Sequence, residues 1–387
     1  MGVTDLSEAC RLCGAGLSAT PLVELPAAPR GAQAFLSDKD VASDTPISIA
    51  VRQCVACGLV QATSEPVPNW QHVIRASGYS PTMREVRQRQ FSALLAMADR
   101  RELRVLEAGS GPGDNLPILA KCGVSAFGVE ASATNVEECL ARGLVVELGY
   151  PTQGRALRHG PFDAFISTNV LEHAVDPRDF LAGVRANLLP GAIGIVEVPS
   201  LERMIEGERA YDVIADHLSY FTAETLRLAL ELSGFEVIEV SREWWPDDLS
   251  ATVRVREPIV FDGGQAALDR TVAAVRGFLD RNAGSGPLAV WGASHQALTL
   301  LSLARATDAA YVVDSAPFKQ GRLTPATHLR VVAPSHLAKE PPGAVLVMAA
   351  GYSEEVARIL RTDHGYRGPI GVLRDGWIEG APMDDSG

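Results

Sequence analysis

Two pairs of cysteines near the N-terminus have the spacing of metal ligands. Cys10 and Cys13 form one C-x-x-C-G motif and Cys54 and Cys57 form a second, with 40 residues between Cys13 and Cys54. Two thiolates at this spacing can bind one tetrahedral metal ion, and the glycine after each pair permits the tight turn. Four thiolate ligands leave no coordination position for a substrate. The pattern therefore predicts a structural zinc site.

A glycine-rich segment has the residues of a cofactor loop. Glu107 precedes Gly109, Gly111 and Gly113, between an expected strand and an expected helix. Such a loop lets the backbone approach a nucleotide closely, because glycine has no Cβ to collide with it. Glu130 ends the next expected strand, where a carboxylate can accept both hydroxyls of a ribose. The acidic residue before the glycines favours S-adenosylmethionine, and NAD stays the alternative.

A later segment decides between these cofactors. Ser167-Thr-Asn-Val-Leu-Glu-His173 follows another expected strand and resembles the segment common in class I methyltransferases. Leu189-Pro-Gly191 then leads into a further strand, as an L-x-P-G turn does in that superfamily. We therefore expect S-adenosylmethionine as the cofactor, with Asn169 among its binding residues, and an NAD-dependent dehydrogenase as the competing interpretation.

Alternating strand and helix patterns are expected to position these residues. Expected strands lie at residues 104–107, 126–130, 162–167 and 193–198, and expected helices at 83–100, 116–121, 135–142 and 177–189. Further strands are expected at 288–291, 310–313 and 344–348. This alternation predicts parallel sheets with crossover helices. We expect an α/β protein with a small zinc-binding domain (1–70), a Rossmann-like class I methyltransferase core (71–250) and a second Rossmann-like domain (251–387).

Composition limits the partners. The 387 residues carry 35 basic and 47 acidic side chains, a formal net charge of −12. Nucleic acids and anionic membranes would be repelled on average, so we expect a small-molecule substrate instead. Residues 1–9 do not resemble a signal peptide, and the apolar run 343–350 is shorter than the about 20 residues of a membrane span. These features predict a cytoplasmic protein with reduced cysteines, and they leave the oligomeric state open.

The order of zinc motifs, methyltransferase core and second α/β unit resembles the nucleotide-sugar C-methyltransferases of deoxysugar biosynthesis. The matching motifs are Gly78-Tyr79, Asn169-Val-Leu-Glu-His173, Asp216-His217-Leu-Ser-Tyr-Phe221 and Asp314-Ser-Ala-Pro-Phe-Lys-Gln-Gly-Arg-Leu-Thr-Pro325. The resemblance implies methylation of the carbon next to the ketone of a dTDP-linked 4-keto sugar. A base would remove the acidic proton, and the resulting enolate carbon would attack the methyl group.

The resemblance also implies roles for individual residues. The family's base falls on His217, with Asp216 orienting it, and an imidazole with a pKa of about 6.5 can accept a proton at neutral pH. Tyr79 and His173 match positions that contact the substrate or carry protons. Lys319 and Arg322 are cations able to meet the diphosphate of the substrate.

Departures from the family pattern gather around the expected substrate. The family's Y-x-E-H reads Ile214-Ala-Asp-His217 here, which removes a phenol and shortens the acid by one methylene. His295 stands where relatives often have lysine, and residues 350–354 differ from the family motif. Two other interpretations therefore stay open: a methyltransferase of the same architecture with another natural-product substrate (methylated on carbon, oxygen or nitrogen), and a non-catalytic binding module that retains the cofactor.

Overall fold

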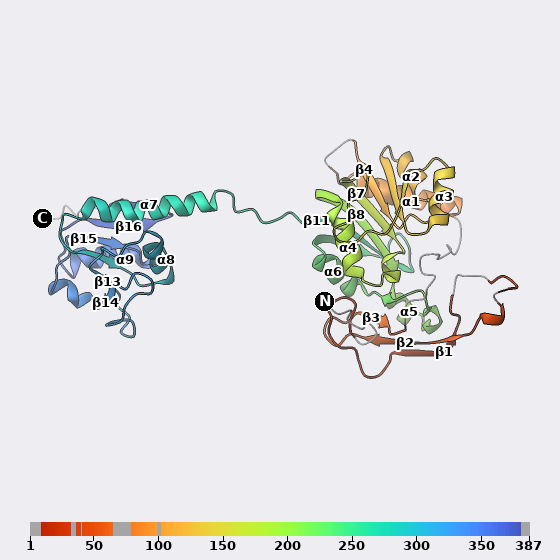
Figure 1. Cartoon of the computed structure of the whole chain (residues 1–387), viewed down its shortest axis with the longest axis horizontal. Helices are drawn as coiled ribbons and strands as arrows, with labels where there is room; N and C mark the ends of the chain where they lie inside the picture. The colour runs from red at the N-terminus through yellow and green to blue at the C-terminus, as the bar shows by residue number, and fades with distance from the viewer. Residues whose placement is uncertain (1–8, 32–35, 40, 65–78, 99–101, 381–387) are drawn as a thin grey trace. The chain divides into compact units, whose positions relative to one another are not determined.

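The chain divides into two compact units, Met1–Pro258 and Ile259–Gly387, each with its own central sheet (Figure 1). The computed structural model describes residues 9–31, 36–39, 41–64, 79–98 and 102–380. Gly78 of the predicted Gly78-Tyr79 motif lies outside these residues. The domain boundaries expected near residues 70 and 250 stay predictions.

The N-terminal part of the first unit is a small antiparallel sheet. Its strands are β1 (Val23–Ala28), β2 (Ile47–Gln53), β3 (Val60–Ala62) and β9 (Ser219–Tyr220), in that order. Strand β9 comes from far along the chain and pairs with β3 through Val60 and Tyr220. This pairing brings the segment that follows Asp216 and His217 against the cysteine-bearing part of the chain.

The central sheet of the first unit has seven strands in the order β10-β11-β8-β7-β4-β5-β6. Their bounds are β4 (Arg104–Ala108), β5 (Ser125–Glu130), β6 (Val146–Leu148), β7 (Phe162–Thr168), β8 (Leu188–Pro199), β10 (Phe235–Ser241) and β11 (Asp248–Val255). Strands β4 to β8 pair in parallel, and β11 is antiparallel to both β8 and β10. Successive connections run to opposite sides of β4, and a ligand crevice is expected at such a switch point.

Helices cover both faces of this sheet, and neighbouring residues of one strand, which point to opposite sides, contact different helices. Val105 packs against α1 (Pro81–Leu95) and α2 (Leu116–Lys121), whereas Leu106 faces α4 (Pro177–Ala186) and α6 (Ala223–Leu232). The unit also contains α3 (Ala133–Ala141) and α5 (Leu201–Glu206). Helix α1 begins two residues before the expected 83–100, because Ser80 accepts a hydrogen bond from the Met83 amide and Pro81 follows it, a strong N-cap. The helix ends at Leu95, earlier than expected.

The second unit repeats the arrangement with six strands in the order β14-β13-β12-β15-β16-β17. They are β12 (Leu288–Trp291), β13 (Tyr311–Val313), β14 (Arg330–Val332), β15 (Ala344–Val347), β16 (Ile370–Arg374) and β17 (Trp377–Gly380), and only the last pairing in this order is antiparallel. Helices α7 (Gly264–Asn282) and α8 (His295–Leu303) pack on one face and α9 (Ser353–Thr362) on the other. The predicted α/β class with two Rossmann-like sheets is confirmed.

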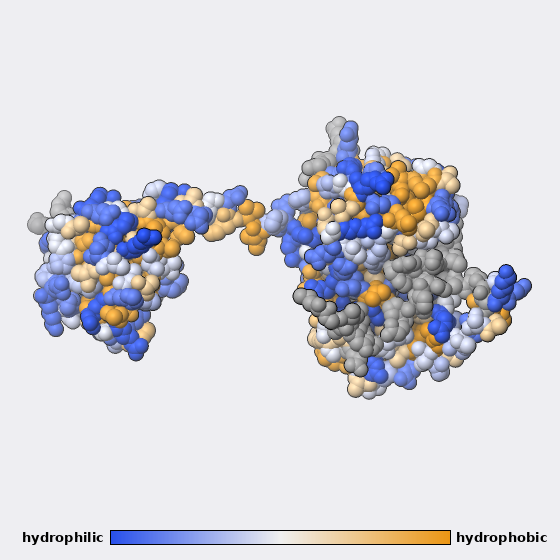
Figure 2. Space-filling model, viewed as in Figure 1, coloured by the Kyte–Doolittle hydropathy of each residue, from blue (hydrophilic) through white to orange (hydrophobic). Residues whose placement is uncertain are grey.

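Hydrophilic and apolar residues are interspersed over the face of each unit that Figure 2 shows. An apolar segment precedes α7, in which Ile259, Val260 and Phe261 are 101%, 65% and 87% exposed. These three residues join none of the hydrophobic clusters formed by the described residues. Within the described parts of the chain, no helix combines the length and the apolar character that crossing a membrane would require.

Candidate active site

A cleft of about 430 Å³ lies at the carboxyl ends of β4, β5, β7 and β8, and we call it the central cleft. It gathers most of the residues predicted for cofactor binding and catalysis: Tyr79, Glu107, Gly109, Gly111, Glu130, Asn169, His173 and His217. Gly113 and Asp216 are not among the residues that line the cleft. Residues expected from separate motifs therefore share one cavity.

The three glycines of the cofactor loop have different structural reasons to be glycine. All three have positive φ angles, which L side chains rarely adopt. A Cβ on Gly109 would lie 2.5 Å from Val170 Cγ2, and one on Gly113 would lie 2.6 Å from Leu144 Cδ1. A Cβ on Gly111 would have no described atom within 4 Å. Gly111, which lines the cleft, therefore has open space around its Cα, whereas the other two glycines permit close internal packing.

Glu130 holds the glycine loop from the end of β5. Its Oε2 accepts a hydrogen bond of 2.8 Å from the Gly111 amide, and its Oε1 accepts one of 2.9 Å from the Ser132 amide. Because a carboxylate oxygen can accept more than one hydrogen bond, Glu130 keeps acceptor capacity toward the cleft. The arrangement suits recognition of vicinal hydroxyls.

Glu107 is buried at the base of the cleft. Asn115 Nδ2 donates a hydrogen bond of 2.8 Å to Glu107 Oε1, while Glu107 Oε2 has no hydrogen-bond partner among the described residues. Burial raises the pKa of Glu107 to about 8. An unpartnered acceptor at this place fits a ligand with donor groups, such as the ammonium group of an amino acid. Asn115 was not predicted from the sequence, although its position between the glycine loop and α2 could have indicated a site residue.

Two histidines meet where η3 (Leu171–His173) approaches the segment before β9. The ring centroids of His173 and His217 are 4.8 Å apart in an edge-to-face arrangement. His173 Nδ1 lies 2.8 Å from the backbone oxygen of Asp216, which can accept its proton. Glu172 Oε1 lies 3.8 Å from His173 Nε2. Asp216 itself is 6% exposed, and through its carbonyl it orients His173.

Burial sets the charge of this cluster. It lowers the pKa of His217 to about 3, helped by the neighbouring His173, and lowers the pKa of His173 as well. Burial also raises the pKa of Glu172 well above its ordinary value. Both imidazoles are therefore neutral at pH 7, and each keeps one nitrogen lone pair available to accept a proton or bind a cation.

Three further residues that line the cleft, Arg87, Trp245 and Asp248, were not predicted from the sequence. The Arg87 guanidinium carbon lies 4.8 Å from the Trp245 ring centroid and 6.0 Å from that of Tyr79. Arg87 forms a buried ion pair with Glu197 of β8. Asp248, at the start of β11, also lines the cleft, and burial raises its pKa to about 6. Burial likewise raises the pKa of the Tyr79 phenol, although Arg87 opposes this.

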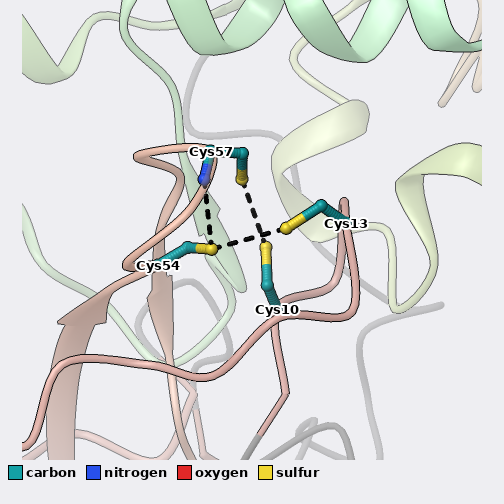
Figure 3. Close-up of side chains that lie close together, drawn as sticks. All are labelled: Cys10, Cys13, Cys54 and Cys57. Atoms are coloured by element: carbon teal, nitrogen blue, oxygen red, sulfur yellow. Dashed lines mark hydrogen bonds between the residues drawn. The ribbon is translucent and has the colours of Figure 1, made fainter.

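The four predicted zinc ligands come together in the first unit (Figure 3). Cys10 Sγ lies 3.5 Å from Cys57 Sγ, and Cys13 Sγ lies 3.4 Å from Cys54 Sγ. Sulfur atoms around a tetrahedral zinc ion are about 3.8 Å apart, given Zn–S bonds of about 2.3 Å. Backbone amides of Ala56 and Cys57 each approach Cys54 Sγ at 3.4 Å, as in a metal-binding knuckle. The donor set and its geometry fit one zinc ion.

The predicted substrate-binding cations lie in the second unit. Lys319 Nζ forms a 2.9 Å ion pair with Asp314, whose carboxylate also accepts a 2.9 Å hydrogen bond from the Ala293 amide. Arg322 is exposed. A second cleft is lined by residues of α8, of the segment that follows β15 and of the end of β16. His295 lines this cleft, whereas Lys319 and Arg322 do not.

Comparisons with known proteins agree with this architecture. Residues 82–240 match the methyltransferase domain family, and residues 251–368 match the C-methyltransferase C-terminal domain family. The C-methyltransferase NovU of Streptomyces niveus is 23% identical over 303 residues, which cover 65% of this chain and 67% of NovU.

Two further relatives cover smaller parts of the chain. A ubiquinone biosynthesis O-methyltransferase of Caulobacter sp. (strain K31) is 32% identical over 110 residues, 27% of this chain and 43% of that enzyme, so the match spans less than half of its length. The solved structure of the CcbJ methyltransferase from Streptomyces caelestis superposes with a TM-score of 0.38 at 19% identity, covering 46% of this chain and 97% of that one. By the succession of its two matched domains, the chain belongs to the S-adenosylmethionine-dependent methyltransferases that carry a C-methyltransferase C-terminal domain.

Proposed function

We propose that this C-methyltransferase methylates the carbon next to the ketone of a nucleotide-linked 4-keto sugar. The observation that carries the proposal is the neutral imidazole of His217 in the same cleft as the cofactor loop. A proton on such a carbon is acidic enough to be removed by a positioned base. NovU, which is 23% identical to the chain over 303 residues, is named as a C-methyltransferase.

The cofactor would be held by the loop residues of the central cleft. Glu130 offers acceptors for the ribose hydroxyls, Glu107 offers one for the ammonium group, and Gly111 leaves room for the ligand. Asn169, which has a φ of 56° and lines the cleft, would contribute a polar side chain beside the loop. S-adenosylmethionine supplies a methyl group bonded to a positively charged sulfur.

His217 would accept the proton from the substrate carbon. Its ring is neutral and therefore carries a free lone pair, but a pKa of about 3 makes it a weak base in the resting cleft. The negative charge that develops on the enolate would raise this pKa and favour the transfer. His173, oriented by the Asp216 carbonyl, lies at the edge of the His217 ring, and the phenol of Tyr79, which lines the same cleft, would donate to a substrate oxygen.

The sugar is the finer part of the proposal. Ile214 stands where the family has tyrosine, and its backbone amide and carbonyl both bond to the Tyr220 hydroxyl at 3.2 Å. Tyr220 therefore brings a phenol near this position, although that phenol is occupied by the backbone. We assign Lys319 and Arg322 to the nucleotide end of the substrate, as the family resemblance implies. The alternative is another natural product methylated on carbon, oxygen or nitrogen.

We also propose that Cys10, Cys13, Cys54 and Cys57 bind one structural zinc ion. The four sulfur atoms lie within 4.8 Å of one another, and no cysteine of the described chain forms a disulfide. Four thiolates complete a tetrahedral shell, so the ion would stabilise the fold without contacting a substrate.

Two assays test the proposal. With S-adenosylhomocysteine bound and in D₂O, the wild-type protein should exchange the acidic proton of a dTDP-4-keto-6-deoxy sugar, and His217→Gln should not. With labelled S-adenosylmethionine, the label should appear on carbon. His336→Gln, in the second unit, is the matched control. Tight S-adenosylhomocysteine binding without exchange, or label on oxygen or nitrogen, would refute the carbon acceptor.

A further inference from the structure

We propose that Glu172, His173 and His217 form a second metal site, which binds one divalent transition-metal ion within the central cleft. The three side chains each offer one ligand atom, and these atoms all lie within 4.8 Å of one another. The site is separate in chemistry from the cysteine cluster, because its donors are two imidazole nitrogens and a carboxylate oxygen. All three residues line the cleft.

The orientation of His173 is that of a metal ligand. Its Nδ1 donates to the Asp216 backbone carbonyl at 2.8 Å, which leaves the lone pair on Nε2. Metal-binding histidines commonly donate their other ring N–H to a carbonyl or carboxylate in this way, since the bond fixes the tautomer and the ring. The free nitrogen lies 3.8 Å from Glu172 Oε1.

Glu172 supplies the second, independent observation. The residue is 1% exposed, and its Oε2 is buried without a hydrogen-bond partner in the described structure. No arginine or lysine of the described residues forms an ion pair with it; the salt-bridge contact it has is to His173. Burying a carboxyl group without partners is costly, and a bound cation would satisfy both of its oxygens.

Two histidines and one carboxylate favour a particular class of ion. Imidazole suits zinc, copper, iron and nickel, and a set of two histidines and one carboxylate leaves other coordination positions open. Bonds of about 2.0–2.2 Å place neighbouring ligand atoms roughly 3–3.5 Å apart. A separation of 4.8 Å would therefore have to shrink by about 1.3–1.8 Å, which is less than about 1 Å at each of the two atoms. The open side of the site faces the cleft, where water or a substrate oxygen can complete the shell.

A metal ion on the ring nitrogen of His217 would occupy the lone pair that takes the proton in our proposed function. Metal binding would therefore inhibit methyl transfer, and this consequence rests on that function. The binding itself does not, so the two can fail separately.

Calorimetric titration of Ni²⁺ tests the binding. The sample is the full chain without a histidine tag, with zinc in its cysteine cluster. We expect one Ni²⁺ per chain, with affinity weakened in Glu172→Gln and in His173→Gln by more than the roughly 10–100-fold that loss of an outer-shell partner costs. His336→Gln is the matched control, because His336 also lies beside a glutamate, Glu340, but in the second unit. Equal affinity in wild type and both variants, or loss in the control, would overturn the site.

Absorption of Co²⁺ bound to the wild-type protein gives a measurement that needs no variant. Nitrogen and oxygen ligands should give weak visible bands without the intense near-ultraviolet sulfur bands of the cysteine cluster. Sulfur bands alone, or no bound Co²⁺, would contradict the proposal. If Ni²⁺ binds but the protein does not methylate the sugar in the absence of Ni²⁺, the metal site stands and the proposed function falls. If the sugar is methylated and Ni²⁺ does not bind, the reverse holds.

Discussion

Alanine substitutions at Gly111 and Gly113 separate the two uses of glycine in the cofactor loop. Both residues have positive φ angles, +51° and +79°, so each alanine costs about 1–2 kcal/mol of backbone strain. At Gly111, which lines the cleft, the new methyl group would meet no described atom within 4 Å. At Gly113 it would lie 2.6 Å from Leu144 Cδ1 and 2.9 Å from Cys139 Sγ.

The two variants should therefore differ in what they lose: mainly stability at Gly113 and mainly ligand affinity at Gly111. Overpacking adds about 1–3 kcal/mol to the cost at Gly113, so Gly113→Ala should lose about 2–5 kcal/mol of unfolding free energy and Gly111→Ala about 1–2. For a unit of this size, each kcal/mol lowers the melting temperature by about 2–4 °C. Gly111→Ala, in turn, should lose more than about tenfold in affinity for S-adenosylhomocysteine, or about 1.4 kcal/mol, because its methyl group takes space that the ligand needs.

Thermal unfolding without ligand and calorimetry with S-adenosylhomocysteine measure the two effects. The reasoning is refuted if Gly111→Ala binds S-adenosylhomocysteine as tightly as the wild type does. A greater loss of thermal stability in Gly111→Ala than in Gly113→Ala would refute the packing argument.

Three further perturbations follow from the described contacts. The pKa of Glu107 is raised to about 8 from about 4.5 in the unfolded chain, so its contribution to stability is complete below pH 4.5 and is lost as the pH rises through 8. By pH 8, Glu107→Gln should therefore exceed the wild type by roughly 3–5 kcal/mol in unfolding free energy, seen as a higher melting temperature, and by little at pH 5. An equal difference at both pH values would contradict the assignment. Arg87→Met leaves the Glu197 carboxylate buried without its ion pair and should lower the unfolding free energy by about 3–5 kcal/mol. The double variant Arg87→Met/Glu197→Gln should restore part of this loss, because it also removes the buried charge. If the double variant is no more stable than the single one in thermal unfolding, the buried charge is not the cause. Chelation under reducing conditions should release one zinc ion per chain from the cysteine cluster, measured with a colorimetric reagent. The first unit should lose several kcal/mol of unfolding free energy and melt at a lower temperature, and an unchanged melting temperature would argue against a structural ion.

The parts of the site that the sequence predicts best are continuous in the chain. Glu107 and the three glycines form one loop between a strand and a helix, so their neighbourhood follows from local structure. The two cysteine pairs are local in the same sense, because each C-x-x-C turn brings its own two sulfur atoms together. The second pair lies in the turn between the paired strands β2 and β3. The predicted fold class is confirmed for the same reason: alternating strands and helices follow from periodicity.

Three other residues that line the cleft could not be predicted in this way. Arg87, Trp245 and Asp248 come from α1, from the loop after β10 and from the start of β11, and a sheet with a reversed strand order brings them together. None belongs to a motif, and each side chain is ordinary for its local pattern. The raised pKa of Asp248 is likewise a consequence of burial, which sequence spacing does not give.

Lys319 shows how a motif can identify a residue and leave its role open. Its charge and its place in the motif predicted a contact with the substrate diphosphate. The structure gives it a partner five residues earlier in the same turn, since Lys319 Nζ lies 2.9 Å from Asp314. Asp314 also accepts hydrogen bonds from the Ala293 and Ala316 amides, so this ion pair ties the turn to the end of β12. A diphosphate would have to compete with that carboxylate for Lys319, whereas the exposed Arg322 forms no ion pair within the described residues and meets no such competition.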